Sequence, residues 1–216
     1  MMKNFSRVLK NLCILAFLAC SFLSNPLSVY GLQEEALFAG GCFWCLEHDL
    51  ENLSGVESVE SGYSGGNFKN PNYRQVSEKK TDHQESVRVL FDPQEISYEN
   101  LLRSYWRNID PFDEEGQFCD KGDSYLPVIF TNNENQVLKA RESLNKAAVE
   151  LGVLKEDLKV EVKNATNFWI AEDYHQDFAV KNPVKYKFYR FNCGRDFRLE
   201  KVWGSRARSD SEWKLD

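Results

Sequence analysis

One stretch in the first quarter of the chain decides the fold, and it runs Ala39-Gly40-Gly41-Cys42-Phe43-Trp44-Cys45-Leu46-Glu47. The apolar run before it, residues 36–39, is typical of a buried strand. The helical spacing i, i+4, i+7 follows it at Leu46, Leu50 and Leu53. Two glycines between these segments allow a tight turn and close backbone approach. The stretch therefore predicts a strand, a sharp turn, and a helix with Cys42 at its N-terminus.

This position predicts a reactive thiol. Unpaired N–H groups and the helix dipole favour an anion at a helix N-terminus, so we expect a lowered pKa for Cys42 and an available thiolate. Cys45 follows one helical turn later on the same face, within reach of a disulfide if the geometry allows. Two buried, inert cysteines are the structural alternative, but two cysteines at this spacing after a strand and paired glycines favour redox chemistry.

The composition predicts an ordinary globular protein behind an N-terminal targeting segment. The chain has 216 residues, 42% of them hydrophobic and 28% charged. In residues 1–31, three basic residues precede an apolar run at 12–23, which is shorter than the about 20 apolar residues of a transmembrane helix. We therefore expect a secretory signal, and an exported protein in the periplasm or another extracytoplasmic space. An uncleaved membrane anchor is the alternative.

Residues 32–200 are predicted to form a single catalytic domain, followed by a polar C-terminal tail at 201–216. Loss of residues 1–31 removes three positive charges and no acids, which changes the formal net charge from −6 to −9. An acidic surface argues against nucleic acid and anionic membranes as partners.

Alternating and periodic patterns predict strands and helices in mixed order. Strands are expected at 56–63, 85–91, 125–130 and 158–162. Helices are expected after Ser97, from Asn132 or Asn133 to a stop at Gly152, and at 168–178 before Pro183. The segment after Pro183 shows no usable period. The predicted fold is α+β, a two-layer α/β sandwich with a ferredoxin-like mixed sheet flanked by helices and a long irregular C-terminal tail.

A thiolate that acts on a substrate needs a proton donor, and Glu85 is the candidate. It opens an apolar strand, where desolvation raises a carboxyl pKa and makes the group an acid at neutral pH. A surface glutamate is the alternative, and the residues alone favour it. Further hydrogen-bonding candidates on loops or loop edges are Tyr73, Asp120 and Tyr125. No metal site is expected, because the three histidines are scattered and a second paired cysteine motif is absent.

The segment Gly41-Cys42-Phe43-Trp44 resembles the active-site motif of the A-type peptide methionine sulfoxide reductases. Four further segments resemble that family in the same order: Gly62-Tyr63-Ser64-Gly65-Gly66, Asn70-Pro71-Asn72-Tyr73, the stretch 82–93 around Glu85, and Ala171-Glu172-Asp173-Tyr174-His175-Gln176 with Lys181-Asn182-Pro183. Asp120 and Tyr125 fall at the family's later aspartate and tyrosine positions. The similarity covers about residues 36 to 190.

The resemblance implies a reaction. The Cys42 thiolate would attack the sulfur of methionine S-sulfoxide, in a protein or as the free amino acid, and Glu85 would protonate the leaving oxygen. The resemblance also gives supporting roles to Tyr73 and Tyr125 as hydrogen-bond donors, to Phe43 and Trp44 as the apolar pocket for the substrate methyl group, and to Asp120 in orienting water or the nucleophile. Methionine is released and Cys42 becomes a sulfenic acid, which condenses readily with a second thiol.

A disulfide then forms, and an external thioredoxin-like dithiol reduces it. No cofactor and a monomeric state are implied. Cys45 is the first choice for the resolving thiol by its spacing, and Cys193 on the tail follows closely. Cys119 is third, or structural. The chain departs from the family at Cys45, where many members have Gly, and at Leu126-Pro127, where Arg-Ser is usual.

Two other functions fit parts of the sequence. An exported thioredoxin-like disulfide oxidoreductase would also place Cys42 and Cys45 between a strand and a helix, but it has no use for Glu85. A secreted binding module with structural disulfides would use the four cysteines after residue 31 without catalysis.

Overall fold

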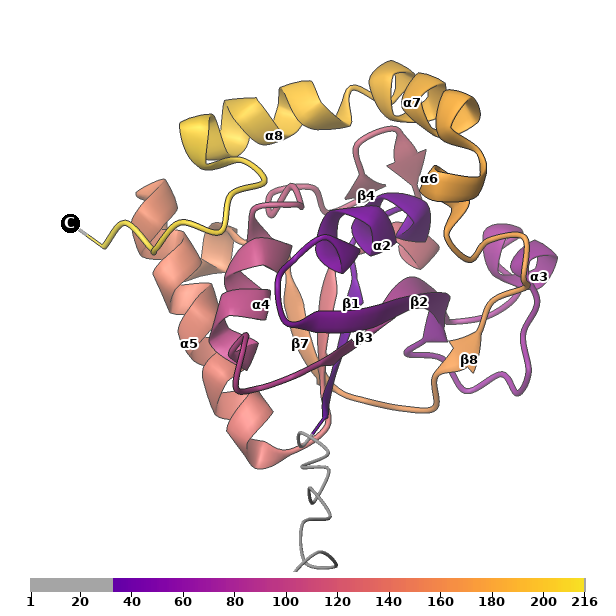
Figure 1. Cartoon of the computed structure of the whole chain (residues 1–216), viewed down its shortest axis with the longest axis horizontal. Coiled ribbons are helices and arrows are strands. Elements are labelled where there is room, and N and C mark those ends of the chain that lie inside the picture. The colour runs from indigo at the N-terminus through magenta and orange to yellow at the C-terminus, as the bar shows by residue number, and fades with distance from the viewer. Residues whose placement is uncertain (1–32, 216) are drawn as a thin grey trace, which may run out of the picture. The chain divides into compact units, whose positions relative to one another are not determined.

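The centre of the molecule is a six-stranded mixed sheet in the order β7-β6-β1-β3-β2-β8 (Figure 1). The computed structural model describes residues 33–215. The strands of this sheet are β1 (Glu34–Ala39), β2 (Val56–Ser64), β3 (Gln84–Phe91), β6 (Val128–Thr131), β7 (Glu161–Asn164) and β8 (Trp169–Ile170). Neighbouring strands are antiparallel except β6 and β7, which are parallel. A separate small hairpin joins β4 (Gly116–Gln117) to β5 (Asp120–Lys121).

Seven α-helices surround the sheet within the described residues: α2 (Phe43–Glu51), α3 (Tyr73–Ser77), α4 (Tyr98–Trp106), α5 (Glu134–Leu151), α6 (Phe178–Lys181), α7 (Pro183–Asn192) and α8 (Arg195–Trp203). Their ends follow the capping residues predicted from sequence. Ser97 accepts a hydrogen bond from Asn100 N–H at 3.2 Å, and Asn133 accepts one from Gln136 N–H at 2.9 Å. Gly152 ends α5 in the left-handed conformation, with φ at +67°.

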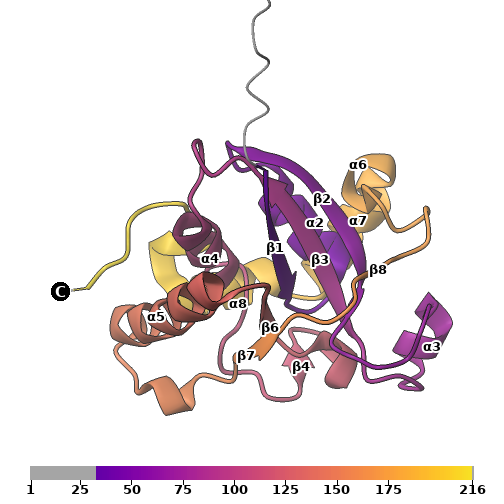
Figure 2. The same cartoon turned by 90° about the horizontal axis from the view of Figure 1, so that it is seen from below.

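Helices α2, α4 and α5 contribute side chains to one large core against the sheet (Figures 1 and 2). In this core the Phe38 ring of β1 stacks on Tyr105 of α4 with centroids 4.8 Å apart. A smaller cluster contains Leu37, Phe130 and their neighbours, packed against the partly buried Phe168. The predicted α+β architecture, a mixed sheet flanked by helices, is confirmed.

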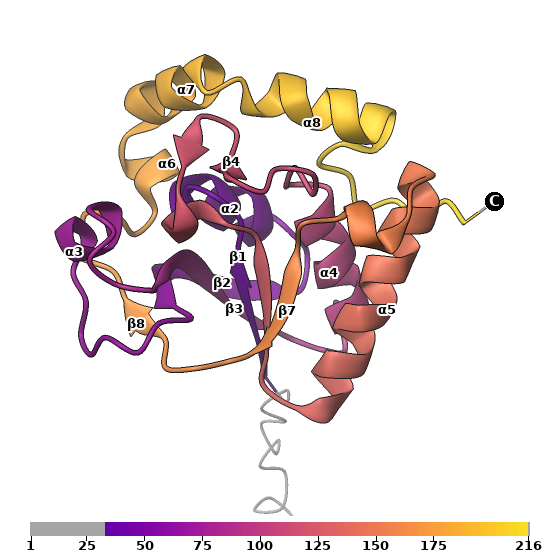
Figure 3. The same cartoon turned by 180° about the vertical axis from the view of Figure 1, so that it is seen from behind.

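The irregular C-terminal tail predicted from sequence is wrong, because residues 183–203 form α7 and α8, which lie end to end above α2 (Figures 1 and 3). Pro183 does not end a helix but begins α7, at the position where its missing N–H costs nothing. The predicted helix at 168–178 is also wrong, since β8 and a series of turns occupy that segment. The period of α7 escaped detection because its exposed positions carry Phe188 and Phe191 while Arg190 is largely covered.

Two of the predicted strands begin later in the structure than the sequence indicated. Residues 123–125 form a short 3₁₀ turn, so β6 begins at Val128, after Pro127, which has no N–H to donate to the sheet. β7 begins at Glu161 rather than at 158.

The C-terminal residues are part of the domain rather than a separate polar tail. The proposed boundary at residue 200 falls inside α8, and the indole of Trp203 is buried and donates to Ile109 O at 3.0 Å. Arg107 and Glu150 form a buried ion pair, with Nη2 and Oε2 3.0 Å apart. This pair holds the segment after α8 against the domain. Arg107 donates to the carbonyl of Glu212 at 3.0 Å, and Glu150 accepts from the N–H of Lys214 at 2.9 Å.

The predicted signal, residues 1–31, lies outside the described residues. Among the helices that the structure describes, none is long and apolar enough to cross a membrane.

Replacement of Glu150 by Ala is expected to destabilise the protein by about 3–5 kcal/mol, because it leaves Arg107 as an uncompensated buried charge. Urea unfolding followed by circular dichroism measures this loss. Glu142→Ala is the control, because Glu142 pairs with Lys146 on the exposed face of the same helix, and its unfolding midpoint should match the wild type. Equal midpoints for all three proteins would show that the buried pair does not hold the C-terminal segment.

Candidate active site

A small cavity of about 60 Å³ lies at the N-terminus of α2, lined by Cys42, Phe43, Trp44, Tyr73, Glu85, Asp120, Tyr125 and Tyr189. Seven of these eight residues are those singled out from the sequence. They come from α2, α3, β3, the β4–β5 hairpin, the following 3₁₀ turn and α7. Side chains far apart in the chain therefore meet in one place, and all but Tyr189 are residues to which the resemblance gives a role.

Cys42 is the N-cap residue of α2, as predicted, and it is 6% exposed. The turn before it depends on glycine. Gly41 has φ at +81°, and a Cβ there would meet Gln117 Cβ at 2.6 Å. A Cβ on Gly40 would meet Ile109 at 2.8 Å. The paired glycines thus let the chain pass close to the hairpin and deliver the Cys42 sulfur to the cavity.

Glu85 lies near the start of β3 and is 3% exposed. Its Oε2 accepts a hydrogen bond from the backbone N–H of Phe43 at 3.1 Å. Burial raises the pKa of Glu85 to about 8, although this hydrogen bond opposes the shift. The carboxyl group is therefore mostly protonated at neutral pH, and the surface-glutamate alternative is wrong.

The two tyrosines also remain protonated. Burial is the main cause that raises the pKa of Tyr73 to about 12, and burial likewise raises the pKa of Tyr125. Glu172 fixes Tyr73 by accepting its backbone N–H at 2.9 Å. Both phenols can thus donate hydrogen bonds into the cavity at neutral pH.

Asp120 lies on the hairpin opposite α7. Its Oδ2 accepts a hydrogen bond from the hydroxyl of Tyr189 at 2.5 Å. Burial raises the pKa of Asp120, and this hydrogen bond opposes the change. The Asp120–Tyr189 contact closes the wall of the cavity between the hairpin and α7.

The aromatic residues after Cys42 have different surroundings. Trp44 donates from Nε1 to His175 Nδ1 at 3.0 Å, and its ring stacks on Phe178 with centroids 3.7 Å apart. Burial lowers the pKa of His175 to about 4, so the ring is neutral and Nδ1 accepts. Phe43 is buried, and its ring packs against the His175 ring with centroids 4.8 Å apart. Trp44 is therefore fixed in orientation, with a second aromatic ring over it.

The expected low pKa of the Cys42 thiol is wrong for the resting protein. Burial raises the pKa of Cys42, and the contact with the Cys45 thiol raises it further; the Tyr189 hydroxyl opposes the shift. The hydrogen bond from Cys42 lowers the pKa of its partner Cys45, and Arg195 adds to that lowering. Desolvation outweighs the helix N-terminus, so Cys42 rests as a thiol whose proton faces Cys45.

The other two cysteines among residues 33–215 are paired with each other. Cys119 and Cys193 form a disulfide, while Cys42 and Cys45 are free thiols. Cys193 Sγ lies 3.8 Å from Asp120 Oδ2, so this disulfide is next to the wall of the cavity. Cys119, Asp120 and Cys193 are grouped closely enough to hold a metal ion, but the disulfide occupies both sulfurs.

Sequence reasoning missed Tyr189 as a cavity residue and left Glu172 and His175 without roles. The last two lie in a segment that resembles the family, but their hydrogen bonds to Tyr73 and Trp44 exist only in the folded chain. Tyr189 stands four residues before Cys193, one turn of α7, and only the prediction of a helix there would have related the two.

Comparison with known proteins identifies the family. The model of the family "Peptide methionine sulfoxide reductase" matches residues 34–207. A peptide methionine sulfoxide reductase MsrA 2 of Caulobacter vibrioides is 47% identical over 171 residues, which cover 79% of this chain and 86% of the relative. The protein of the same name from Rhizobium meliloti is 44% identical over 194 residues, 90% of this chain and 95% of the relative.

Solved structures agree. Methionine sulfoxide reductase A of Corynebacterium diphtheriae matches with a TM-score of 0.66 and 29% identity, over 73% of this chain and 78% of that chain. Reduced Mxr1 from Saccharomyces cerevisiae shares the fold, with a TM-score of 0.66 and 24% identity over 70% of this chain and 87% of that chain. These findings rule out the thioredoxin-like and binding-module alternatives, and the chain belongs to the peptide methionine sulfoxide reductase family, A type.

Proposed function

We propose how the residues of the cavity divide the work of reducing methionine (S)-sulfoxide to methionine, the activity of this family. The observation that carries the proposal is a protonated, buried carboxyl group, Glu85, in the same cavity as the Cys42 thiol. A sulfoxide oxygen is a poor leaving group unless it is protonated, so an acid and a sulfur nucleophile are needed together.

In the chemical step, Cys42 Sγ attacks the sulfoxide sulfur while Glu85 donates its proton to the oxygen. The sulfur–oxygen bond of the substrate breaks and methionine leaves. The oxygen stays on Cys42 as a sulfenic acid, so the cysteine sulfur has lost the two electrons that the substrate gained. The Cys42 thiol proton makes good the one that Glu85 gives up, so the step takes up and releases no proton overall.

Other groups of the cavity position the substrate. Tyr73 and Tyr125 donate hydrogen bonds to the sulfoxide oxygen, and Trp44, held by His175, offers an apolar surface to the methyl group. Asp120 and Tyr189 orient the nucleophile or a water molecule from the opposite wall.

Cys45 is the resolving residue in this proposal. It follows Cys42 by one helical turn and its thiol interacts with the Cys42 thiol, whereas Cys193 is engaged in the disulfide with Cys119. Attack of the Cys45 sulfur on the sulfenic acid forms the Cys42–Cys45 disulfide, and the hydroxyl leaves as water with the proton of the Cys45 thiol. A thioredoxin-like dithiol then provides two electrons. The basic and apolar N-terminal sequence supports an exported location for this cycle.

The function is tested by incubating the protein with peptide methionine S- and R-sulfoxides and dithiothreitol. We expect methionine from the S epimer alone, and no turnover from Cys42→Ser. Turnover by the serine variant, or equal use of both epimers, would contradict the proposal.

Glu85→Gln is expected to lower kcat/KM by about 10²–10⁴-fold near pH 7, because Gln donates a hydrogen bond but no proton. The wild-type carboxyl is protonated below its pKa of about 8, so activity should fall as the pH rises through that value. The variant should lack this fall. Rates measured from pH 6 to 10 check both effects, and a wild-type rate that stays level above pH 8 would exclude Glu85 as the acid.

Cys45→Ser is expected to release one methionine per enzyme and to keep Cys42 as a sulfenic acid, because no adjacent thiol condenses with it. Quenched-flow measurement of methionine, with mass spectrometry of the dimedone-labelled protein, detects both. Cys193→Ser is the comparison variant, and its Cys42 should form a disulfide with Cys45 after the first turnover. A sulfenic acid in that variant would move the resolving role to Cys193.

A further inference from the structure

The outer side of the C-terminal helices is apolar. Five side chains there are between 66% and 83% exposed, namely Val180, Val184, Phe188, Phe191 and Phe197. We call this set the α7–α8 face. An exposed apolar patch of this kind marks a site of interaction with a protein or with a membrane.

Helix α7 presents an apolar stripe between two lysines. Because successive helical residues are about 100° apart, Val184, Phe188 and Phe191 lie within about 60° of one another around the helix axis. Lys187 lies on one side of this stripe and Lys185 on the other, and both lysines are exposed. Aromatic and aliphatic side chains with basic residues beside them are typical of a helix that lies in the interface of a membrane.

The opposite side of α7 belongs to the domain. Tyr186 is buried in a cluster with Cys45, and the Tyr189 hydroxyl donates to Asp120 at the wall of the cavity. Helical spacing puts both tyrosines away from the apolar stripe. The outer side of α7 can therefore bind a flat surface while the inner side keeps its contacts at the cavity.

The charge near this face differs from the charge of the whole chain. The formal net charge of the chain is −6, but residues 178–195, which include α6 and α7, contain five basic residues and no Asp or Glu. The net charge argues against an anionic membrane as a partner of the protein surface as a whole. It does not describe the α7–α8 face, where the local charge is positive.

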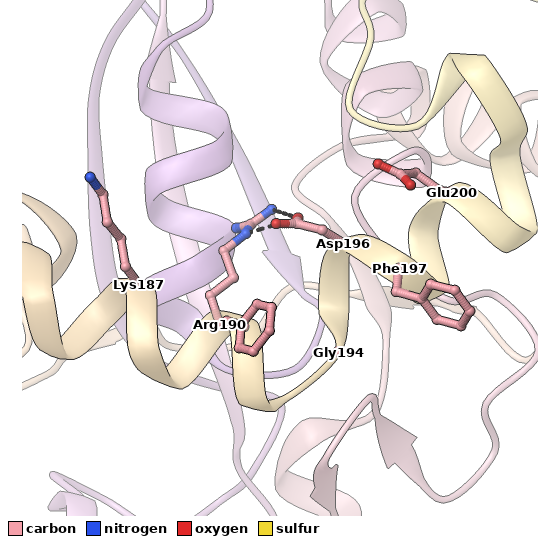
Figure 4. A pocket seen from close by; sticks show the side chains of 7 residues that line it. Lys187, Arg190, Gly194, Asp196, Phe197 and Glu200 are labelled. Carbon is pink, nitrogen blue, oxygen red and sulfur yellow. Dashed lines mark hydrogen bonds and ion pairs between the residues drawn. The ribbon is translucent and has the colours of Figure 1, made fainter.

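The acids that follow this stretch are paired with arginines. Asp196 and Glu200 line a groove of about 320 Å³ at the turn between α7 and α8 (Figure 4). Figure 4 shows Arg190 joined to Asp196 across this turn, with nitrogen and oxygen 2.7 Å apart. Arg208 pairs with Glu200 at 3.2 Å. These ion pairs reduce the repulsion that the two carboxylates would exert on a phosphate group.

The lysines favour a lipid surface over a protein partner. Lysine is depleted in protein–protein interfaces relative to the rest of a protein surface. A two-fold dimer through this face would bring Lys185 and Lys187 of both copies together, because the same patch meets itself. At an anionic bilayer the same lysines meet negative headgroups, and the exposed rings leave water.

We propose that the α7–α8 face binds the surface of an anionic phospholipid bilayer. Phe188, Phe191 and Phe197 enter the boundary between headgroups and acyl chains, and Lys185 and Lys187 contact the phosphates. The binding is peripheral, and the secretory signal predicted at residues 1–31 would bring the chain to a membrane during export. This inference does not rest on the proposed function, because it uses no side chain of the cavity.

Binding is measured by sedimentation with sucrose-loaded vesicles. The chain from residue 32 onward is used, because residues 32–216 form a compact unit of their own and contain the whole family match, 34–207. The apolar run at 12–23 then cannot bind the vesicles itself. We expect binding to vesicles of equimolar phosphatidylglycerol and phosphatidylcholine at about 0.1 M salt. Binding should be about tenfold weaker or more at about 1 M salt and on phosphatidylcholine alone.

The apolar part of the face is tested with Phe188→Ser/Phe191→Ser. The matched control is Leu138→Ser/Leu154→Ser, whose leucines are 67% and 70% exposed elsewhere on the domain. The phenylalanine variant should bind the anionic vesicles about tenfold more weakly or worse, because its rings no longer enter the bilayer. The leucine variant should bind like the wild type. Thermal unfolding followed by circular dichroism checks that both variants are folded.

The charged part is tested with Lys185→Gln/Lys187→Gln, and its control is Lys155→Gln/Lys159→Gln, which removes two exposed lysines outside the face. The first variant should lose about tenfold or more in affinity for the anionic vesicles, and most of its salt dependence. The control has the same net charge and should keep the wild-type affinity. Equal affinities for the two lysine variants would show that net charge, and not this face, governs binding.

Hydrogen exchange with mass spectrometry locates the contact. Anionic vesicles should slow exchange within residues 178–197, and protection confined to another part of the domain would overturn the proposal. Absence of binding by the wild type, or equal binding to both kinds of vesicle, would also overturn it. A wild-type dimer that the phenylalanine variant dissolves, without vesicle binding by either protein, would assign the face to a second copy of the chain instead.

Discussion

The active site depends on one buried contact, the hydrogen bond from the N–H of Phe43 to the Glu85 carboxyl group. It joins the first turn of α2 to β3, the strand beside the central β1, and so fixes the distance between nucleophile and acid. The contact forms only because Gly41 lets the chain turn at φ +81° against the hairpin. Burial keeps the carboxyl protonated, and a protonated carboxyl still has an oxygen that can accept this N–H. The Glu85 carboxyl group can therefore accept the N–H of Phe43 and still carry the proton that catalysis needs.

Contacts from α6 and α7, and from the residue that follows α7, complete the wall of the cavity. Phe178 stacks on Trp44, the Tyr189 hydroxyl reaches Asp120, and the Cys119–Cys193 disulfide ties the hairpin to the end of α7. These contacts bring residues far apart in the chain onto one wall. The disulfide closes a loop of 74 residues, so in the chain-entropy account it stabilises the closed wall by limiting the unfolded chain. The same helices that complete the cavity also present the exposed apolar face.

The sequence was sufficient for the parts of this arrangement that follow local rules. The strand–glycine–helix unit around Cys42, the caps at Ser97 and Asn133, and the end at Gly152 each need only neighbouring residues. The family resemblance then brought Glu85, Tyr73, Asp120 and Tyr125 to one site. The C-terminal helices could not be found in this way, since α7 exposes Phe188 and Phe191 and covers Arg190 with ion pairs to Asp49 and Asp196. That pattern is the reverse of the usual apolar face, and only the folded partners of Arg190 explain it.

The pKa of Cys42 also could not be predicted from neighbouring residues alone, and its raised value affects how the thiol reacts. A helix N-terminus favours a thiolate, but here desolvation dominates, so the resting nucleophile is a thiol. A permanent thiolate reacts with oxidants in general, whereas a buried thiol is inert until a substrate fills the cavity. In the reaction proposed for this site, Glu85 activates the sulfoxide, and Cys45 lies beside Cys42 to attack the sulfenic acid that forms. Reactivity is then assigned to the complex with substrate rather than to the free enzyme.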